Sequence, residues 1–535
     1  MSAVDNKFPA EVKAQDAVNG VQANGSSKPA FRLTNSPCIP NGPLPAEGSG
    51  AFNNYHLAAI VILVPWFVQR CLPFGRRSWY IYFFLFIVLG LPLTIGYWIL
   101  TSRYGPPKNN KVPMPNRPLS DYYIIVDEEM RTKWDGKKMP MQVWHDAYFD
   151  GKIQLAPGLT LLDVLEYRYD WSRFELSFEN FRYVLFNLIP DVIFHTQKQD
   201  VDHVRDNYDR GNDFYSWFLG PRMIYTGGII SDVTREETLE ELQDNKLNIV
   251  CDKLQLKSTD DLLDIGCGWG TLAAHAAKNY GCQVTGITVA QGGADWGNQR
   301  LRESGIPESQ GRILCMDYRD FPKDKKFSKI TCLEMAEHVG IRRYRTFLNE
   351  LYNLLEDDGI MIFQVAGLRK CWQFEDLIWG LFMNKYVFPG ADASLNCGWV
   401  VNELEGAGFE VQSVDVFGVH YAATINGWYK NWVSNREKVE ATYGPRWYRV
   451  WLYFLAYSII VARQGGSSVF QITVHKNLNG FHRVDMIPSH PVIKTLRRKG
   501  EFTPIDTHKE WFPQVYGTSV PAVAPVVAPA VAPAA

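Results

Sequence analysis

Two long apolar stretches stand out in an otherwise polar N-terminal part of the chain. The second, Trp79 to Leu100, runs for 22 residues without a charged side chain, which is enough for a helix to cross about 30 Å of hydrocarbon. Aromatic residues gather at both of its ends, as they do at membrane–water interfaces. The first stretch, Tyr55 to Leu72, contains an unbroken apolar run of only 12 residues, from Leu57 to Val68. We predict two N-terminal membrane helices within residues 55–102, with a re-entrant hairpin as the alternative.

From about residue 260 onward, short apolar segments alternate with helical patterns. We expect strands at residues 261–265, 283–289, 312–316, 327–333, 360–365, 411–416 and 469–475. Leucines at helical spacing predict a helix over residues 343–355, and a second helix over 271–280 follows the first strand. Thr234 and Glu237 have the spacing of a capping box, which predicts the start of another helix there. This alternation predicts an α/β fold with a mostly parallel, doubly wound sheet.

The remaining segments divide the chain. Residues 1–54 are rich in small and polar residues, and residues 519–535 are almost entirely Val, Ala and Pro, so we expect both to be disordered. We expect a proline-rich linker and a lead-in region over residues 103–206, the main folded domain over 207–480, and a C-terminal extension over 481–518. The chain does not open with a basic segment followed by an apolar core, so no secretory signal peptide is predicted.

Composition narrows the classes of function. Hydrophobic residues make up 46% of the chain and aromatic residues 14%, so a large core can form and the chain as a whole is not disordered. The 55 basic and 57 acidic residues give a net charge of −2, which argues against nucleic-acid binding by bulk charge. The nine cysteines form no CxxC pair and no compact cluster with histidine. This pattern excludes a disulfide scaffold, disfavours a metal site and fits a reducing, cytosolic environment.

A glycine-rich turn follows the first strand of the series. Residues 264–270, Asp-Ile-Gly-Cys-Gly-Trp-Gly, place three glycines at alternate positions, so the backbone can approach a ligand at the carboxyl end of the strand. The spacing is GxGxG, which differs from dinucleotide and phosphate-binding motifs, and the turn contains no Lys or Arg. It resembles motif I of the class I methyltransferases, which implies S-adenosylmethionine as the cofactor. An ordinary tight strand–helix turn is the alternative.

Six segments resemble the cyclopropane-fatty-acid synthases and mycolic-acid cyclopropane synthases, in the order in which that family has them. They are residues 207–215 (NYDRGNDFY), 263–270 (LDIGCGWG), 286–288 (GIT), 337–340 (EHVG), 388–390 (FPG) and 446–451 (RWYRVW). With the apolar stretches in front, the chain resembles the fungal sphingolipid 9-methyltransferases, which methylate carbon 9 of an unsaturated sphingoid base in a ceramide. The resemblance implies a class I methyltransferase fold with a seven-stranded sheet and a helical lipid-binding cap over residues 422–464.

The chemistry of this family is electrophilic methylation of a lipid alkene. The double bond takes the methyl group of S-adenosylmethionine, a carbocation forms on the lipid, and a base removes a proton. Loss of the proton from the new methyl group closes a cyclopropane, whereas loss from a neighbouring carbon leaves a methyl-branched alkene. Such a site must exclude water, which would trap the cation.

The cyclopropane synthases hold a bicarbonate ion as this base with a Cys, a Glu, a His and a Tyr. By resemblance, Glu337 matches the Glu and Tyr421 matches the Tyr, whereas Gly227 stands at the Cys position and Gln364 at the His position. The loss of two of the four ligands favours methyl branching over ring closure. The resemblance therefore implies Glu337 or Tyr421 as the catalytic base, with Gln364 beside them in the catalytic site.

The resemblance also implies which residues bind the cofactor. Class I methyltransferases usually have an acidic residue after the second strand for the ribose hydroxyls, and this sequence lacks it. His338 is interpreted as structural. The implied cofactor-binding residues are Tyr225, Thr226, Leu262, Leu263, Asp264, Ile265, Gly266, Cys267, Gly268, Trp269, Gly270, Thr288, Val289, Ala290, Gln291, Gly292, Gly293, Asp317 and Tyr318.

Three functions stay open at this point. The leading hypothesis is a methyltransferase that branches a sphingolipid, with several membrane passes, a place in the endoplasmic reticulum and a catalytic domain facing the cytosol. The second is a cyclopropane synthase that acts on unsaturated phospholipid acyl chains. The third is a non-catalytic membrane protein with a degenerate methyltransferase fold. A lipid and a membrane are the expected partners; we expect neither nucleic acid nor metal.

Overall fold

The computed structural model describes residues 53–73, 78–104, 117–190, 211–370, 374–389 and 395–480. Several predicted segments lie outside these residues. They are most of the N-terminal segment 1–54, residues 105–116 of the linker, residues 191–206 of the lead-in region, residues 207–210 and 390 of the family motifs, and both C-terminal segments after residue 480.

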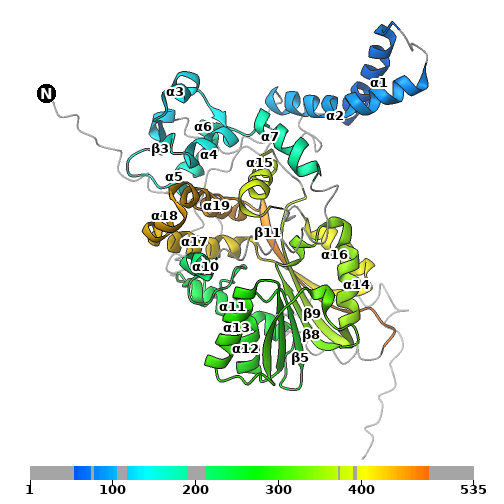
Figure 1. Cartoon of the computed structure of the whole chain (residues 1–535), viewed down its shortest axis with the longest axis vertical. Coiled ribbons are helices and arrows are strands. Elements are labelled where there is room, and N and C mark those ends of the chain that lie inside the picture. Colours follow the sequence, from blue (N-terminus) through cyan, green and yellow to red (C-terminus); the bar gives the residue numbers. More distant parts are fainter. Residues whose placement is uncertain are drawn as a thin grey trace, which may run out of the picture. The chain divides into compact units, whose positions relative to one another are not determined.

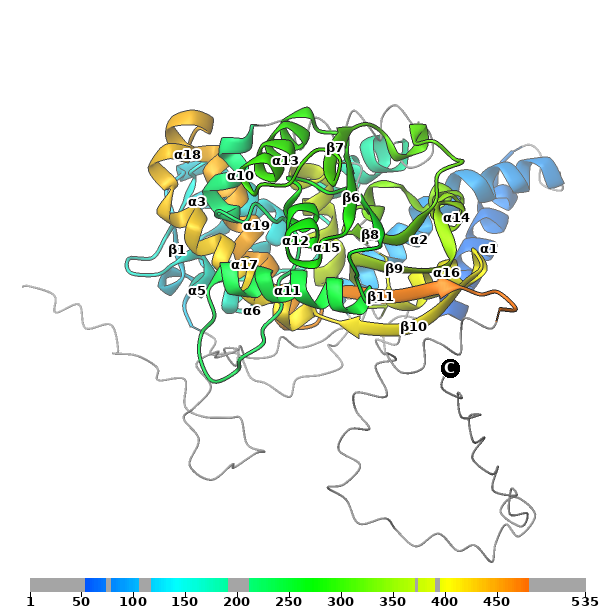
Figure 2. The same cartoon turned by 90° about the horizontal axis from the view of Figure 1, so that it is seen from below.

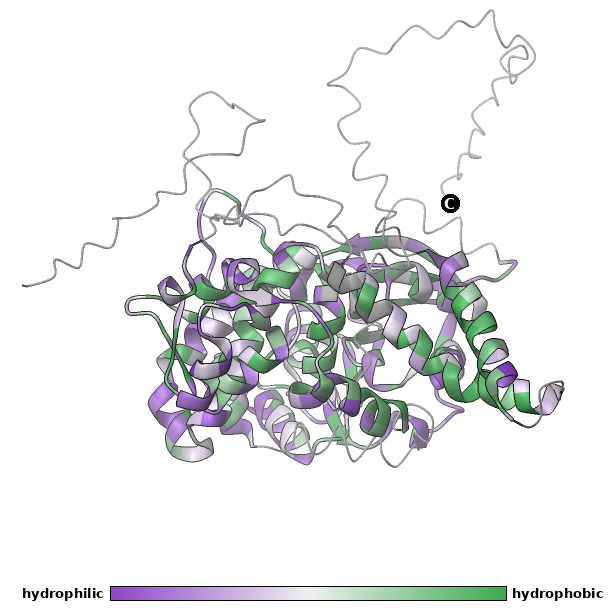
Figure 3. Ribbon diagram, turned by 90° about the horizontal axis from the view of Figure 1, so that it is seen from above, coloured by the Kyte–Doolittle hydropathy of each residue, from purple (hydrophilic) through white to green (hydrophobic). Residues whose placement is uncertain are grey.

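Two helices come first in the described chain. Helix α1 spans Asn54–Cys71 and helix α2 spans Trp79–Tyr104. They pack against each other (Figure 1), and Gln69 Nε2 donates a hydrogen bond to Ser78 O at 2.7 Å. Figure 3 shows this helical pair largely in the colour of hydrophobic residues. The apolar N-terminal stretches therefore form a helical hairpin.

Only one of these helices supports the prediction of membrane helices. Among the described residues, the window Trp79–Tyr97 is the one helical segment long and apolar enough to cross a membrane, and none of it is buried. Helix α1 falls short of this criterion because its 18 residues include the polar residues Asn54, His56, Gln69 and Arg70. The prediction of two membrane-spanning helices is thus supported for α2 and not for α1.

Short elements fill residues 119–188. The helices are η2 (Leu119–Asp121), α3 (Glu128–Trp134), α4 (Met141–Phe149), α5 (Leu161–Glu166), α6 (Arg168–Trp171), α7 (Phe178–Tyr183) and the π-helical η3 (Val184–Leu188); the strands are β1 (Tyr123–Ile125), β2 (Met139–Pro140), β3 (Ile153–Leu155) and β4 (Ser172–Arg173). Their apolar side chains share one hydrophobic cluster with the cap described below. Arg168, fully buried, pairs with Glu375 of that cap at 2.5 Å. Much of the predicted lead-in region is therefore built into the core of the cap.

A seven-stranded sheet forms the centre of the main domain, as predicted. Its strands are β5 (Asp261–Ile265), β6 (Gln283–Thr288), β7 (Gly311–Cys315), β8 (Phe327–Leu333), β9 (Leu355–Leu368), β10 (Phe409–Val416) and β11 (Ser467–Lys476). The order across the sheet is β10-β11-β9-β8-β5-β6-β7. Strands β5 to β9 pair in parallel, and β11 pairs antiparallel with both β9 and β10. Strand β9 begins five residues before the predicted start at Ile360 and is the longest strand of this sheet.

Helices cover both faces of the sheet (Figure 1). On one side lie α11 (Leu239–Lys253), α12 (Thr271–Tyr280) and α13 (Gln291–Glu303), and on the other lie α14 (Tyr344–Leu354) and α16 (Cys397–Gly406). The doubly wound arrangement is therefore confirmed. The predicted capping box at Thr234 is wrong, because the box that caps α11 is formed by Thr238 and Glu241. Thr234 instead donates to Asp232 in the preceding turn. Three short 3₁₀ helices connect strands: η4 (Tyr318–Asp320), η5 (Ala336–His338) and η6 (Ile341–Arg343).

The cap consists of helices inserted before β5, between β9 and β10, and between β10 and β11. They are α10 (Asn212–Leu219), α15 (Phe374–Phe382), the π-helical η7 (Met383–Val387), α17 (Gly418–Ser434), α18 (Arg436–Tyr443) and α19 (Pro445–Arg463). Figure 2 shows α17 beside the sheet helix α11, and these two helices contact each other. Trp428, Trp432 and Trp451 are almost completely buried among aromatic neighbours. The apolar run Trp451–Val461 lies inside α19 and is buried throughout, so the prediction of a packed cap helix is confirmed.

Candidate active site

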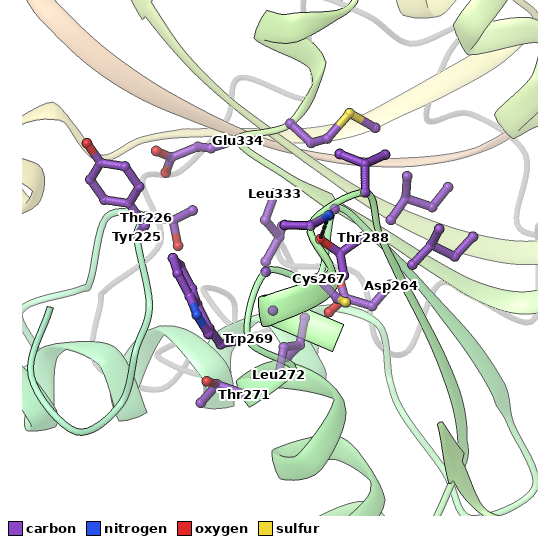
Figure 4. Close-up of a pocket in the computed structure, with 18 of the residues that line it drawn as sticks. Tyr225, Thr226, Asp264, Cys267, Trp269, Thr271, Leu272, Thr288, Leu333 and Glu334 are labelled. Atoms are coloured by element: carbon purple, nitrogen blue, oxygen red, sulfur yellow. Dashed lines mark hydrogen bonds between the residues drawn. The ribbon is translucent and has the colours of Figure 1, made fainter. Parts of the chain in front are cut away.

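A cavity lies at the carboxyl ends of strands β5, β6 and β8, which is the edge where open α/β sheets bind ligands. Its wall combines residues 223–226, which precede α11, with the turns that follow β5 and β6 and the segment that follows β8 (Figure 4). The predicted glycine turn is therefore part of a cavity wall, and the sheet brings together segments that are far apart in the sequence.

The glycine turn keeps the cavity open. Gly266 and Gly268 have φ angles of 74° and 55°, which side chains rarely allow. A Cβ atom at Gly268 would meet nothing within 4 Å, whereas one at Gly293 would lie 2.8 Å from Gly268 O. The lack of a side chain at 293 thus lets the first turn of α13 approach the loop closely.

Asp264 provides a buried carboxylate at the base of this turn. Thr331 Oγ1 donates to Asp264 Oδ1 at 2.8 Å. Burial raises the pKa of Asp264 to about 6, and the hydrogen bond from Thr331 and the charge of Lys246 oppose that rise. The carboxylate of Asp264 and the open space at Gly268 fit the amino-acid end of S-adenosylmethionine, because its ammonium group can donate to Asp264.

The cationic side chains that line the cavity are already held by protein groups. Lys246 Nζ donates to Thr226 Oγ1 at 2.5 Å, and burial lowers the pKa of Lys246 to about 8. Arg319 pairs with Asp317 at 2.5 Å. This arrangement suits a ligand without phosphate groups, because neither cation is placed to clamp one.

Asn212 joins the two walls of the cofactor side. Trp269 Nε1 donates to Asn212 Oδ1 at 2.8 Å, and Asn212 Nδ2 donates to Gly292 O at 3.2 Å. One amide side chain on α10 thereby fixes both the glycine turn and the start of α13. Asn212 belongs to the family motif in the sequence, but the pattern alone did not give it this role.

The cavity contains most of the predicted cofactor residues. Those that line it are Tyr225, Thr226, Asp264, Ile265, Gly266, Cys267, Gly268, Trp269, Thr288, Val289, Ala290, Gly293, Asp317 and Tyr318. Those outside its lining are Leu262, Leu263, Gly270, Gln291 and Gly292. The two leucines point into the core of the sheet, and Gln291 donates to Asp295 on the exposed side of α13. Because these five residues do not line the cavity, the cavity does not support their predicted contact with a cofactor.

The predicted catalytic residues lie one layer behind the cavity. Glu337, Tyr421 and Gln364 are absent from its lining. Glu337 Oε1 accepts a hydrogen bond from Ala366 N at 2.5 Å, and Glu337 Oε2 is buried and has no hydrogen-bond partner among the residues that the structure describes. Burial and the charge of Glu334 raise the pKa of Glu337 to about 8. His338, interpreted as structural, does line the cavity, and burial lowers its pKa to about 4.

Glu334, which no sequence pattern singled out, also lines the cavity. Its carboxylate accepts hydrogen bonds from Gly227 N at 3.1 Å and from Gln364 Nε2 at 2.6 Å. Tyr421 also hydrogen-bonds to it. Glu334 follows β8 directly, so its place at a ligand-binding strand end was a signal in the sequence, but the matching motif drew attention to Glu337 instead.

Comparison with known proteins places the chain in a family. Residues 195–472 match the family model for mycolic acid cyclopropane synthetase. The chain is 52% identical over 456 residues to sphingolipid C9-methyltransferase 2 of Gibberella zeae, with coverage of 84% of this chain and 87% of that protein. It belongs to the sphingolipid C9-methyltransferase family. Sphingolipid C9-methyltransferase A of Emericella nidulans is 51% identical over 462 residues, with coverage of 86% and 88% of the two chains.

A solved structure of a more distant relative is also similar. Mycolic acid cyclopropane synthase CmaA1, in complex with SAH and CTAB, is 26% identical, with a TM-score of 0.49, over 52% of this chain and 98% of that one. Membership of the sphingolipid C9-methyltransferase family confirms the resemblance found in the sequence, and with it the assignment to S-adenosylmethionine-dependent lipid C-methyltransferases. The roles of individual site residues stay predictions.

Proposed function

We propose that the chain transfers the methyl group of S-adenosylmethionine to carbon 9 of the unsaturated sphingoid base of a ceramide or related sphingolipid, and leaves a methyl-branched alkene. The observation that carries this proposal is the 52% identity to a sphingolipid C9-methyltransferase over 87% of that protein. Identity at this level over most of both chains supports a shared class of substrate.

The cavity is suited to this reaction. The cofactor supplies the electrophilic methyl group when it is bound. Asp264 and the open edge at Gly268 would hold its amino-acid end, and the residues from Thr288 to Ala290, together with Asp317 and Tyr318, would contact the rest of it. Three carboxylates line the cavity, those of Asp264, Asp317 and Glu334. Figure 4 shows Glu334 apart from Asp264. This separation leaves the Glu334 side for the lipid.

Aromatic rings adjoin the side of the cavity near Tyr225. Tyr225 and Trp428 have ring centroids 5.4 Å apart, and Tyr215 and Trp269 have centroids 4.9 Å apart. Such rings exclude water and present π faces that stabilise a nearby cation. A carbocation on the lipid needs both properties, so the position of these rings supports the proposed chemistry.

A cyclopropane synthase acting on phospholipid is the second candidate. Against it stand Gly227 and Gln364, which occupy the positions that the sequence resemblance assigned to a Cys and a His. A Cβ atom at Gly227 would lie 3.3 Å from the ring of Tyr421, so a cysteine at this position would require that ring to shift by a few tenths of an ångström. The lack of the Cys and the His at these two positions therefore favours methyl branching.

The membrane part of the proposal rests on α2. We propose that the exposed apolar window Trp79–Tyr97 anchors the chain in a membrane, with α1 as a companion limb of a hairpin. The catalytic domain would face the cytosol, where the cofactor is made, and ceramide as substrate favours the endoplasmic reticulum.

Mass spectrometry of labelled lipids tests the function. Membranes that contain the full chain are supplied with S-adenosylmethionine carrying a trideuterated methyl group. We expect a sphingolipid that gains a methyl group with all three deuterium atoms and keeps its double bond. A phospholipid acyl chain that gains a carbon with two deuterium atoms would instead establish ring closure and overturn the proposal.

A further inference from the structure

We infer that Glu334 is the catalytic base, taking the proton whose loss ends the carbocation stage of methyl transfer. The inference rests on the proposed function, because it assigns a residue to that reaction. Neither the sequence motifs nor the family resemblance pointed to this side chain. The groups that surround its carboxylate support this role.

Three donors from three separate segments converge on Glu334. Gly227 N donates from the segment before α11, Gln364 Nε2 donates from β9, and Tyr421 reaches it from α17. The side chain nevertheless lines the cavity. A carboxylate held by three donors and still facing a cavity is fixed in position and open to a ligand, as a proton acceptor must be.

The register of the sheet aligns this carboxylate with a row of polar side chains. Leu333 pairs with Gln364, Gln364 pairs with Gln471, and Gln471 pairs with Asp415 across β8, β9, β11 and β10. Gln471 Nε2 donates to Gln364 Oε1 at 2.8 Å. Both glutamines are completely buried, so each amide keeps the orientation that its neighbours require.

Lys253 fixes the direction of hydrogen bonding along this row. Its ammonium group can only donate, and it does so to Gln471 Oε1 at 2.5 Å and to Asp415 Oδ2 at 2.7 Å. The amide nitrogen of Gln471 must then face Gln364 Oε1, which turns the amide nitrogen of Gln364 toward Glu334. The row therefore offers Glu334 a donor, which stabilises the carboxylate form that can accept a proton.

The backbone at Glu334 is shaped for this contact. Its φ is 55°, in the left-handed region, which is uncommon for a residue with a long side chain and is concentrated at functional sites. Side chains alternate along a strand, so an extended residue 334 would point away from the face of Leu333 and Gln364. The left-handed turn brings the carboxylate back to Gln364, while Glu334 N donates to Gln364 O at 2.7 Å.

The charges in the region favour Glu334 over Glu337 as the base. Two buried carboxylates three residues apart cannot easily ionise together. The pKa of Glu337 is raised to about 8, so Glu337 is mostly protonated at neutral pH. The pKa of Glu334 is raised by burial, but Gly227, Gln364, Lys246 and Tyr421 all oppose that rise. Of the two carboxyl groups, the one that faces the cavity is therefore the first to lose its proton.

The proton step balances without another reactant. After methyl transfer, the lipid carries a cationic carbon, and Glu334 takes a proton from the carbon next to it. The electron pair of the broken C–H bond becomes the second bond of the restored alkene. Glu334 becomes a neutral carboxylic acid, and it returns its proton to water when the product leaves.

Two substitutions of similar size test the assignment in the full chain. In membranes supplied with the trideuterated cofactor, we expect Glu334→Gln to lower formation of branched lipid by at least about 100-fold, the scale of general-base catalysis. Glu337→Gln should lose less than about tenfold, because a glutamine oxygen can still accept from Ala366 N. The exposed Glu308→Gln serves as the matched surface control. Retained activity in Glu334→Gln, with loss in Glu337→Gln, would overturn the inference.

Rescue of activity by a small carboxylate distinguishes the loss of a base from a failure of the variant to fold. Glu334→Ala should be inactive in sodium chloride and regain branching activity in sodium formate, with the rate rising with formate concentration. Absence of rescue in a variant that binds the cofactor like the parent chain would contradict a base at this position. If the unsubstituted chain forms no branched sphingolipid at all, the proposed function fails and the base assignment fails with it. If the unsubstituted chain forms branched sphingolipid and Glu334→Gln forms it at the same rate, only the base assignment fails.

Discussion

The indole nitrogen of Trp269 donates to Asn212 Oδ1 at 2.8 Å, which ties the glycine turn to a helix of the cap. The same amide donates to Gly292 O, so Asn212 holds both sides of the cofactor wall without lining the cavity itself. We predict that Asn212→Ala weakens binding of S-adenosylmethionine about tenfold, since roughly 1.4 kcal/mol is in the range of a lost buried hydrogen bond. Calorimetric titration of the cofactor measures this; unchanged affinity would contradict the role.

The open edge at Gly268 gives a second prediction. A leucine there would extend into the cavity and would also require a left-handed backbone,. Gly268→Leu should abolish detectable cofactor binding and methyl transfer. Gly380→Ala, at a helical position where an added Cβ meets nothing within 4 Å, should bind like the parent chain. Equal binding by both variants would show that the cofactor does not use this edge.

The row of glutamines predicts a change in pH dependence. The carboxylate form of Glu334 is the active base, so kcat/KM should rise with pH as Glu334 loses its proton. Gln471→Leu frees the amide of Gln364 to turn away, which removes a donor that favours the charged form. The pKa of Glu334 then rises further, and the acidic limb of the pH profile should move to higher pH. If the acidic limb of the pH profile of kcat/KM stays at the same pH, whether or not the rate falls, Gln471 has only a packing role.

The buried pair Arg168 and Glu375 gives a prediction for stability. The two side chains are almost completely buried and 2.5 Å apart, and Tyr457 also donates to Glu375 at 2.7 Å. Glu375→Gln leaves the guanidinium without its counter-charge, which should cost about 3–5 kcal/mol of unfolding free energy. Replacing both residues by Met should recover much of that loss. Denaturant unfolding of the full chain in detergent measures both, and a single variant as stable as the parent would contradict the prediction.

Local patterns in the sequence predicted the sheet and the cofactor turn well. Strand β8 lies at the predicted residues 327–333, because an apolar run between polar turns is a strong signal for a buried parallel strand. The packing of residues 119–190 into the cap was not predicted. That packing depends on contacts such as Arg168 with Glu375, which are 207 residues apart in the chain, and no local pattern encodes such a pair.

The glycine motif in the sequence pointed to residues that line the cavity, but it did not point to a residue whose position depends on distant neighbours. Asp264 and Gly268 line the cavity because the strand–turn–helix geometry fixes them locally. Glu334 was passed over in favour of Glu337 because its importance comes from donors at residues 227, 364 and 421, which only the folded chain brings together. A sequence pattern gives the presence of two acids after β8, but it does not tell which of them faces the cavity.

The position of β11 has a consequence for biosynthesis. This strand, the last among the described residues, enters between β9 and β10 and supplies Gln471, so the polar row behind Glu334 cannot form until that part of the chain has left the ribosome. The apolar hairpin at the other end is translated more than 350 residues earlier. With α2 as the proposed membrane anchor, a nascent chain would engage a membrane long before the row behind Glu334 exists, and an interrupted translation product would be anchored without that row.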